Sequence, residues 1–336
     1  MKFQMVAKDF AIDLGTSNIL VYKKGEGLII NEPSSLVLDE NYTKVVAVGQ
    51  QAKDMLGKTH EDIQVIKPIK NGVITDFNLT EAMLNYFFGK VNPGFSLIQP
   101  RVVIVVPSGI TDIQKRAVED AALHAGSRDI ILVDESLAAA YGMNLSPDEP
   151  RGILMINMGA GTSQVAVISL NGIVVSATIN KGGDYLDEKI VDFFRVEKGL
   201  EIGKNSAEEV KNNLASLKIK DGSNEMKVNG RDLADARPKT VKVMSNELVA
   251  SILPFADEVC EMVLEALEKT PPEISSDIKR NGFALSGSLS KLKGLAEYIE
   301  KKIGLKSFHS EDPATDAILG AGQILENPEK FLKYRK

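Results

Sequence analysis

The sequence predicts an α/β protein built from two related halves. Strand-like apolar runs alternate with helical ones along most of the 336 residues, which is the pattern of α/β architecture. Residues 9–22 also reappear in altered form at 154–167. Both copies contain an apolar strand, a polar residue, a turn of Gly, Thr and Ser, and a second apolar strand. Two copies this far apart indicate a duplicated domain, because the units of a solenoid recur every few tens of residues.

The turn in each copy is a candidate anion site. Gly-rich turns present backbone N–H groups to an anion, and Thr and Ser hydroxyls add hydrogen bonds to phosphate oxygens. Two facing turns would hold a polyphosphate; the alternative is a pair of ordinary β-hairpins, since Gly and Ser favour turns without any ligand. Aligning Gly15 with Gly159 places Asp13 opposite Asn157, so one copy offers a carboxylate and the other a neutral amide.

The first half continues with a strand and a capped helix. Residues 101–106 predict a buried strand, and a turn at 107–110 leads to a helix that ends at Gly126. Thr111 is its expected N-cap, with Gln114 completing a capping box. The expected apolar stripe of this helix consists of Ile113, Ala117, Val118, Ala121 and Ala122.

A second strand, at 129–133, runs into Asp134-Glu135-Ser136 and a helix-forming stretch at 137–141. Because the sites of α/β proteins collect at strand ends, Glu135 is placed where a carboxylate could orient a water. The alternative is that an acidic residue simply favours a helix start through the macrodipole.

The second half repeats the alternation. Residues 168–178 predict another hairpin, and 181–184 open a helix. The more polar segment 203–244 has turn signals at 222–224 and 229–230, which predict a small subdomain with a short hairpin.

The C-terminal part begins with a long helix at 248–267, in which Pro254 occupies either the first turns or a kink. Residues 282–294 then predict a strand, a Gly/Ser loop and a helix start. A closing helix is expected at about 314–325.

Composition predicts a soluble, intracellular protein: 43% of residues are hydrophobic, 26% are charged and the net charge is −6. The mild acidity argues against nonspecific nucleic-acid binding, which uses a basic face. The single cysteine, Cys260, excludes an intramolecular disulfide framework and is expected to be buried in a helix. His60, His124 and His309 lack the close spacing of a zinc site.

Membrane contact is expected to be peripheral at most. No stretch approaches the roughly twenty apolar residues that span a bilayer, and a secretory signal is lacking, so a cytoplasmic protein is expected. Phe95, Leu97 and Ile98 would touch a membrane if they formed an exposed loop, with help from residues 1–6. The interpretation we favour is that they pack inward or begin a strand.

Several motifs follow one another in a family order, at residues 13–18, 31–34, 68–77, 107–111 and 135–140. Together they resemble bacterial actin of the MreB type, over nearly the whole chain. The resemblance implies an α/β, actin-like (ribonuclease-H-like, duplicated) fold with ATP or ADP and Mg²⁺ in a cleft between two domains. It also implies cytoplasmic protofilaments for cell shape or movement, made of this chain and in some cases of other MreB-type proteins.

The resemblance also implies domain limits. Domain I would comprise residues 1–145 and 315–336, with a small subdomain at about 33–66. Domain II would comprise residues 146–314, with a small subdomain at about 182–244.

Site residues follow from the resemblance by position. Asp13 looks like the acidic residue near magnesium and its waters, and Glu135 matches the glutamate that helps to position the attacking water. With Ser163 they would be the catalytic residues, weakened by Asn157. The nucleotide-binding residues would be Gly15, Thr16, Ser17 and Asn18 in a first phosphate loop, Gly159, Ala160, Gly161 and Thr162 in a second, and Gly183, Asp184, Glu208, Lys211, Gly287 and Ser288 around the rest of the cleft. For the helical charges, the alternative is a solvated pair three residues apart.

The chain departs from the family pattern at this site. Asn157 stands where the family has Asp, and Ser163-Gln164 replaces Thr-Glu, so two carboxylates have become amides. The third loop, residues 286–290, also lacks two glycines. Asn brings no charge and cannot act as a base, and losing such a group commonly costs about 10²–10⁴-fold in rate. Binding would suffer less, because backbone donors remain.

The leading hypothesis is a nucleotide-binding, filament-forming MreB-like protein with weak or absent ATP hydrolysis. One alternative is a competent ATPase in which Asp13 and Glu135 suffice. Others are a pure scaffold, or a sugar-kinase-like or chaperone-like relative. We find no sugar-site Asp motif, and a chaperone would need a further substrate-binding domain.

Overall fold

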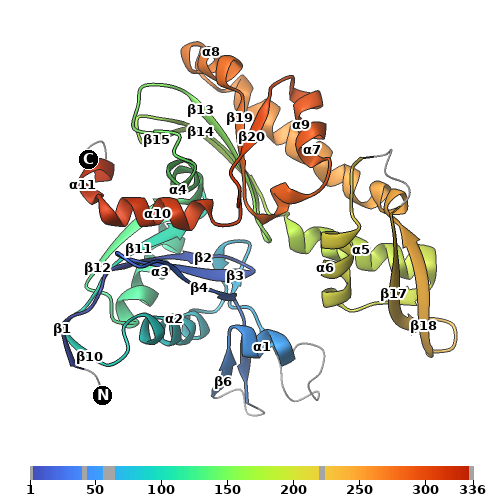
Figure 1. Ribbon diagram of the computed structural model, residues 1–336, viewed down its shortest axis with the longest axis horizontal. Coiled ribbons are helices and arrows are strands. Elements are labelled where there is room, and N and C mark those ends of the chain that lie inside the picture. Colours follow the sequence, from blue (N-terminus) through green and yellow to red (C-terminus); the bar gives the residue numbers. More distant parts are fainter. Residues whose placement is uncertain (1–2, 40–43, 56–64, 219–223, 333–336) are drawn as a thin grey trace.

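The computed structural model of the chain describes residues 3–39, 44–55, 65–218 and 224–332 (Figure 1). Within these residues two five-stranded sheets share one plan: three antiparallel strands, followed on one side by two parallel ones. The hairpins β2–β3 and β13–β14 correspond to the sequence repeat, so the predicted duplication is confirmed.

The first sheet has the order β12-β11-β2-β3-β4. Strand β11 pairs in parallel with both β2 and β12, while β2, β3 and β4 form an antiparallel meander. Its strands are β2 (Phe10–Leu14), β3 (Asn18–Lys23), β4 (Gly27–Pro33), β11 (Arg101–Val106) and β12 (Asp129–Asp134).

The second sheet has the order β15-β14-β13-β19-β20. Here β19 pairs in parallel with both β13 and β20, as β11 does with β2 and β12. Its strands are β13 (Ile153–Met158), β14 (Ser163–Ser169), β15 (Gly172–Ile179), β19 (Phe283–Ser286) and β20 (Ser307–His309).

Two helices, α4 (Glu135–Gly142) and α10 (Asp316–Glu326), lie between the sheets (Figure 1). Alanines and aliphatic residues of both helices form one buried core with residues of both sheets, among them Val103 and Met155. The two helix backbones touch: a methyl group on Gly142 would lie 1.9 Å from the Asp316 carbonyl oxygen. A methyl group on Gly320 would lie 1.7 Å from the Ala138 oxygen, so both positions require glycine.

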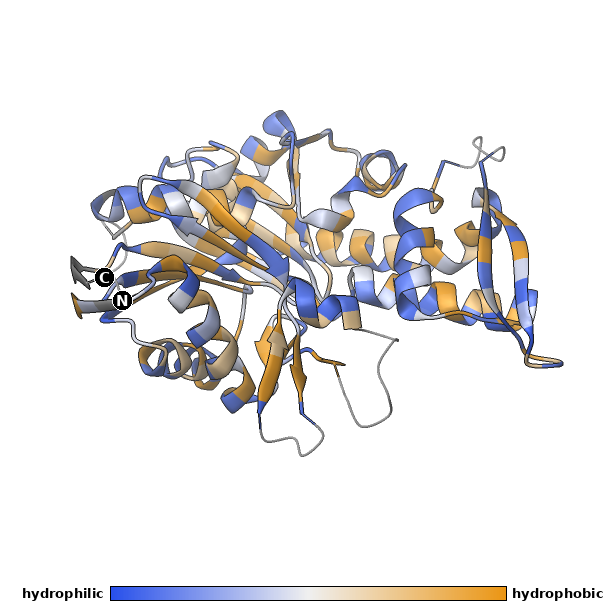
Figure 2. Cartoon of the chain, turned by 60° about the horizontal axis from the view of Figure 1, so that its bottom comes forward, coloured by the Kyte–Doolittle hydropathy of each residue, from blue (hydrophilic) through white to orange (hydrophobic). Residues whose placement is uncertain are grey.

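Other helices cover the outer faces of the sheets. Apolar residues are concentrated on the central strands and on the sides of the helices that pack against them (Figure 2). The first sheet is covered by α2 (Phe77–Val91) and α3 (Asp112–His124). The second is covered by α7 (Val249–Glu268), α8 (Pro272–Asn281) and α9 (Leu295–Ile303), with the short helical turns η1 (Ser245–Leu248) and η2 (Ser288–Lys291). The last helix, α11 (Pro328–Leu332), follows α10 and buries Phe331 in the core between the sheets.

Smaller units border the cleft. On one side lie the sheet β6-β5-β7, the helix α1 and the hairpin β8–β9; on the other lie α5, α6 and the sheet β16-β17-β18 (Figure 1). Their bounds are β5 (Leu36–Leu38), β6 (Val45–Val48), α1 (Gln50–Met55), β7 (Val65–Ile66), β8 (Ile69–Lys70), β9 (Val73–Ile74), α5 (Gly183–Lys198), β16 (Leu200–Glu201), α6 (Lys204–Asn213), β17 (Glu225–Asp232) and β18 (Pro238–Met244).

Several local predictions are confirmed. Thr111 and Gln114 form the capping box of α3, and Cys260 is buried in α7, a helix that contains Pro254 near its start. Phe95 and Ile98 bound a strand, β10 (Phe95–Ile98), which pairs with β1 (Phe3–Val6). The Leu97 and Ile98 side chains nevertheless stay exposed. No helix among the described residues is long and apolar enough to cross a membrane.

Two local predictions are wrong. Ile113 does not belong to the buried stripe of α3, because its first-turn position leaves the side chain 81% exposed beyond the sheet. The pair at 229–230 is not a turn but lies within β17, where Gly230 lets the strand approach the backbone of Glu201. Of the other turn signal, residues 222–223 lie outside the described residues.

Candidate functional site

A cavity of about 530 Å³ opens between the ends of the two sheets. The first and second phosphate loops predicted from the sequence line it from opposite sides, together with Asp13 and Glu135. The remaining predicted binding residues, Gly183, Asp184, Glu208, Lys211, Gly287 and Ser288, also line the cavity. The structure therefore brings together residues that lie more than 250 positions apart in the chain, since Asp13 and Ser288 both line the cavity.

The first phosphate loop is a tight turn between β2 and β3. A methyl group on Gly15 would lie 2.5 Å from the Asn18 carbonyl oxygen, so the turn closes only with glycine. The Thr16 hydroxyl accepts a hydrogen bond of 2.9 Å from the backbone N–H of Gly72, in the β8–β9 turn. This turn, which sequence reasoning did not assign to the site, thereby braces the loop.

The second phosphate loop faces the first at close range. A methyl group on Gly161 would lie 2.5 Å from the Thr16 hydroxyl oxygen and 2.9 Å from the Asn71 Cα. Behind it, the N–H groups of Gly183 and Asp184 donate to the carbonyl oxygens of Gly159 and Ala160, at 3.0 and 2.9 Å. The start of α5 is thus attached directly to this loop.

Asp13 and Glu135 form the acidic floor of the cavity. Side chains alternate along a strand, so Asp13 lies on the same face of the first sheet as Ala11, the face that packs against α4 and α10. Glu135 is the first residue of α4 and lines the same cavity. Burial, and then the charge of Glu135, raise the pKa of Asp13 well above its usual value. Burial also raises the pKa of Glu135, against the opposing effect of hydrogen bonds from Asn157 and Gln164.

Asn157 and Gln164 are paired across β13 and β14, and both contact Glu135 from the buried side. The Gln164 side-chain N–H group donates a hydrogen bond to the Glu135 carboxylate. The Gln164 side-chain carbonyl oxygen accepts a hydrogen bond of 2.7 Å from the backbone N–H of Ser108. Gln164 is fully buried and Asn157 is 2% exposed. These two amides, which stand where the resemblance implies carboxylates, therefore lie behind the cavity and hold Glu135 in place.

Ser163 does not line the cavity, although the resemblance implied a catalytic role. It lies one position from Gln164, so it faces the other side of the sheet with Val165 and Val167. Its hydroxyl donates to the Lys181 carbonyl oxygen at 2.8 Å. The alternation of β14 was the sequence signal for this placement, and the catalytic role of Ser163 stays a prediction.

The third loop, residues 286–290, is shaped by one glycine. Gly287 is the position that needs glycine: its φ is 84°, and a methyl group there would lie 2.3 Å from the Met158 carbonyl oxygen. Ser288 is exposed at the cavity, and Leu289 directs its side chain into the core of the second domain. The backbone of Gly287 therefore packs closely against that of Met158 at the cavity.

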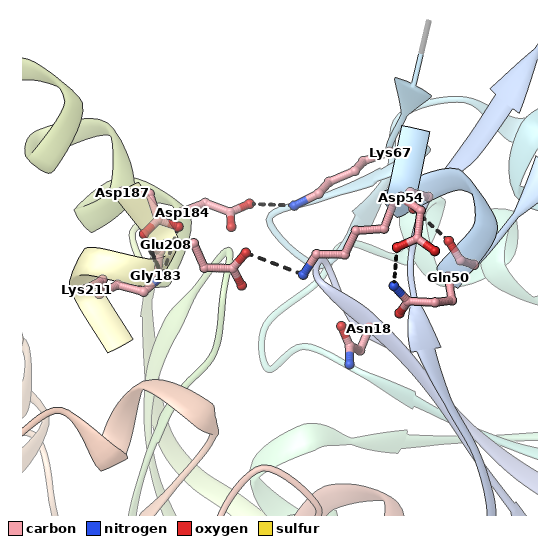
Figure 3. A network of polar contacts seen from close by, with 12 residues as sticks. Asn18, Gln50, Asp54, Lys67, Gly183, Asp184, Asp187, Glu208 and Lys211 are labelled. Carbon is pink, nitrogen blue, oxygen red and sulfur yellow. Dashed lines mark hydrogen bonds and ion pairs between the residues drawn. The ribbon is translucent and has the colours of Figure 1, made fainter. Parts of the chain in front are cut away.

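The side of the cavity lined by α5 and α6 carries a cluster of charges (Figure 3). Lys211 donates to the Gly183 carbonyl oxygen at 3.0 Å and forms a 2.8 Å ion pair with Asp187, and both side chains are largely buried. Burial raises the pKa of Asp187 to about 6; Lys211 lowers it, while Glu208 and Asp184 raise it further. Asn212 and Lys293 also line the cavity and were not predicted.

The residues present fit a hydrated divalent cation. Among the described residues no group of three or more His, Cys, Asp or Glu is placed to ligate a metal directly. Asp13 and Glu135, however, are two partly buried carboxylates whose pKa values are raised, and a cation beside them would relieve their mutual repulsion. This agrees with a metal bound through waters.

A family model described as MreB/Mbl protein matches residues 7–333. The chain belongs to this family. It is 39% identical to the cell shape-determining protein MreB of Escherichia coli K12 over 327 residues, which cover 96% of this chain and 94% of the relative. It is 36% identical to the Mbl protein of Bacillus subtilis, over 98% of this chain and 99% of the relative.

Solved structures of the MreB/Mbl family confirm the predicted actin-like fold. The structure of MreB5 of Spiroplasma citri bound to AMPPNP matches with a TM-score of 0.91 and 31% identity, over 97% of this chain and 98% of MreB5. The ADP-bound form of MreB5 matches with a TM-score of 0.92 at 31% identity, over 99% and 100% of the two chains. A MamK double helical filament shares the fold, with a TM-score of 0.80 at 21% identity, over 96% and 99%.

The raised pKa of Asp187 predicts a specific pH dependence of stability. The folded state binds a proton more tightly there than the unfolded chain, so this residue lowers stability as the pH rises from about 4 to about 6. Asp187→Asn removes this loss. Between about pH 4 and about pH 6 the melting temperature of the variant is therefore expected to increase relative to that of the unmodified protein, by an amount that corresponds to about 1–3 kcal/mol in the free energy of unfolding. Asp192→Asn, an exposed residue of the same helix, is the control. Parallel curves for all three proteins would contradict the prediction.

Proposed function

We propose that this chain is a nucleotide-binding, filament-forming actin homologue of the bacterial cytoskeleton, acting in cell shape or movement, with weak or absent ATP hydrolysis. The observation that carries the proposal is the pair of glycine loops that face each other across a cavity floored by Asp13 and Glu135. The protein would work in the cytoplasm and assemble with itself, and in some settings with other MreB-type proteins.

Nucleotide binding is supported by the way in which the cavity is built. The loop turns at Gly15 and Gly161 leave no room for side chains, so backbone N–H groups are the natural donors to phosphate oxygens. The solved MreB5 structures, which were bound to AMPPNP and to ADP, support ATP and ADP as ligands. Mg²⁺ would supply charge neutralisation of the phosphates, with Asp13 holding its waters.

Weak hydrolysis is supported by the surroundings of Glu135. Positioning a water for attack on phosphate needs a carboxylate free to accept its hydrogen bonds. Here the carboxylate accepts from Gln164 and Asn157, and neither amide can take up a proton. The alternative, a fully competent ATPase that uses Asp13 and Glu135, keeps both carboxylates at the cavity and differs only in rate.

Electron microscopy with ATP, with ADP and without nucleotide tests assembly, and calorimetric titration with ATP and magnesium tests binding. Filaments and binding are both expected, with phosphate release at assembly-competent concentration at least about tenfold slower than in a family member that has both carboxylates. Equal rates would favour the competent ATPase. A flat titration would favour a scaffold that binds no nucleotide.

Asn157→Asp is expected to raise phosphate release by about tenfold or more, since it restores a carboxylate beside the acidic floor. The measurement is steady-state phosphate release with saturating ATP and magnesium, after ATP binding has been verified. Asn229→Asp adds the same charge on an exposed strand and serves as the matched control. An unchanged rate in a variant that folds and binds ATP would count against Asn157 as the limiting residue.

Peripheral membrane contact is a second proposal, which rests on β10. Leu97 is 63% exposed and Ile98 is 48% exposed, beside the paired strand β1. Replacing both by serine is expected to lower co-sedimentation with lipid vesicles several-fold, because buried apolar area supplies the binding free energy. Ile113→Ser, which removes an apolar side chain of α3 that is 81% exposed, is the control. The proposal fails if the double variant sediments like the unmodified protein.

A further inference from the structure

Two ion pairs cross the mouth of the cavity (Figure 3). The Lys53 Nζ atom lies 3.4 Å from Glu208 Oε2, and the Lys67 Nζ atom lies 3.3 Å from Asp184 Oδ2. The lysines belong to the small unit around β5, β6 and β7, whereas the acids belong to α5 and α6 of the other domain. Each pair therefore joins two parts of the chain that are separated by the cleft.

The backbone around each lysine aims its side chain at the cleft. Lys53 lies in α1, which begins after Gly49 in a left-handed conformation and buries Ala52 completely, so the rotation of the short helix is fixed. Lys67 lies between β7 and Pro68, and the next residue, Ile69, is buried.

The acids on the far side lie close to one another and are paired with these lysines across the cleft. Asp184, Asp187 and Glu208 lie close enough to one another that the first and last raise the pKa of Asp187. Within domain II, Lys211 already pairs with Asp187 and with the Gly183 carbonyl oxygen. Lys53 and Lys67 supply the counter-charges for the two remaining acids. A phosphate-bearing ligand would add more negative charge to the same cavity.

The ion pairs are connected to the second phosphate loop. Asp184 carries the Lys67 pair on its side chain, and its backbone N–H group donates to the Ala160 carbonyl oxygen at 2.9 Å. Glu208 is one turn from Lys211, which contacts Gly183, and Gly183 donates to Gly159 at 3.0 Å. Opening of the cleft at the lysines would thus pull on the loop that faces the phosphates.

We propose that Lys53 and Lys67 form a cross-cleft clamp that keeps the cavity closed over a bound nucleoside polyphosphate and slows its release. The clamp rests on the proposed nucleotide binding and adds to it a control of exchange by ionic contacts. All four side chains are 36–43% exposed, so each pair makes a modest and salt-screened contribution. Loss of one pair should speed nucleotide release about two- to fivefold, and loss of both pairs about tenfold.

The test is displacement of a fluorescent ATP analogue in a stopped-flow instrument, with Lys53→Gln, Lys67→Gln and the double variant. Lys67 is the more informative position, because it does not line the cavity, whereas Lys53 does and could also touch the ligand. The matched control is Lys239→Gln with Lys242→Gln, which removes two ion pairs from the β17–β18 hairpin. Arginine at 53 and 67 should restore slow release.

Faster release from Lys67→Gln, loss of the difference in high salt and rescue by arginine would together support the clamp. Release from Lys67→Gln at the rate of the control would overturn it, even where ATP binds normally.

A second readout does not depend on nucleotide binding. Spin labels at Val46 and Lys227, in a Cys260→Ala background, report the distance across the cleft in the nucleotide-free protein. The double glutamine variant is expected to broaden and lengthen this distance relative to the control pair. An unchanged distribution overturns the clamp, while failure of ATP to bind overturns the proposed function instead.

Discussion

The backbone contact between α4 and α10 is the constraint on which the rest of the architecture depends. At Gly142 and Gly320 the two helices approach so closely that not even a methyl group fits between them. The faces of α4 and α10 that point away from this contact pack against the two sheets. The contact therefore fixes the distance between the sheets and their relative direction. The strand ends of the two halves, and with them the two phosphate loops, consequently meet across one cavity.

The duplicated halves are equivalent in topology but not in chemistry. On the inner face, Asp13 of the first hairpin reaches the cavity, whereas Asn157 of the second is buried against Glu135 together with Gln164. A carboxylate at position 164 could not donate to Glu135, and without a shared proton the two groups would repel each other. The Gln164 amide instead links Glu135 to the backbone of Ser108.

Most of the fold could be predicted from hydrophobic periodicity and from the internal repeat. The two hairpins, the capped helix α3 and the helix after residues 181–184 all followed from local sequence pattern. Misses arose where tertiary packing decides. Gly230 resembles a turn residue but makes room for a neighbouring strand, and Ile113 completes a helical stripe that extends beyond the sheet. The β8–β9 turn and Lys53 could not be assigned to the site, since only the folding of the small units brings them there.

Binding and chemistry depend on different parts of this site, which is why the substitutions need not affect both. The loops that would hold phosphates are shaped by Gly15, Gly161 and Gly287, and all three keep the close approaches that exclude a side chain. The Asn157 and Gln164 amides do not shape these loops. They lie behind the cavity, where they hydrogen-bond to Glu135 and so affect its orientation and its pKa. In the proposed function, amides at these two positions would leave the backbone donors to a polyphosphate in place and would change mainly the placement of a nucleophile.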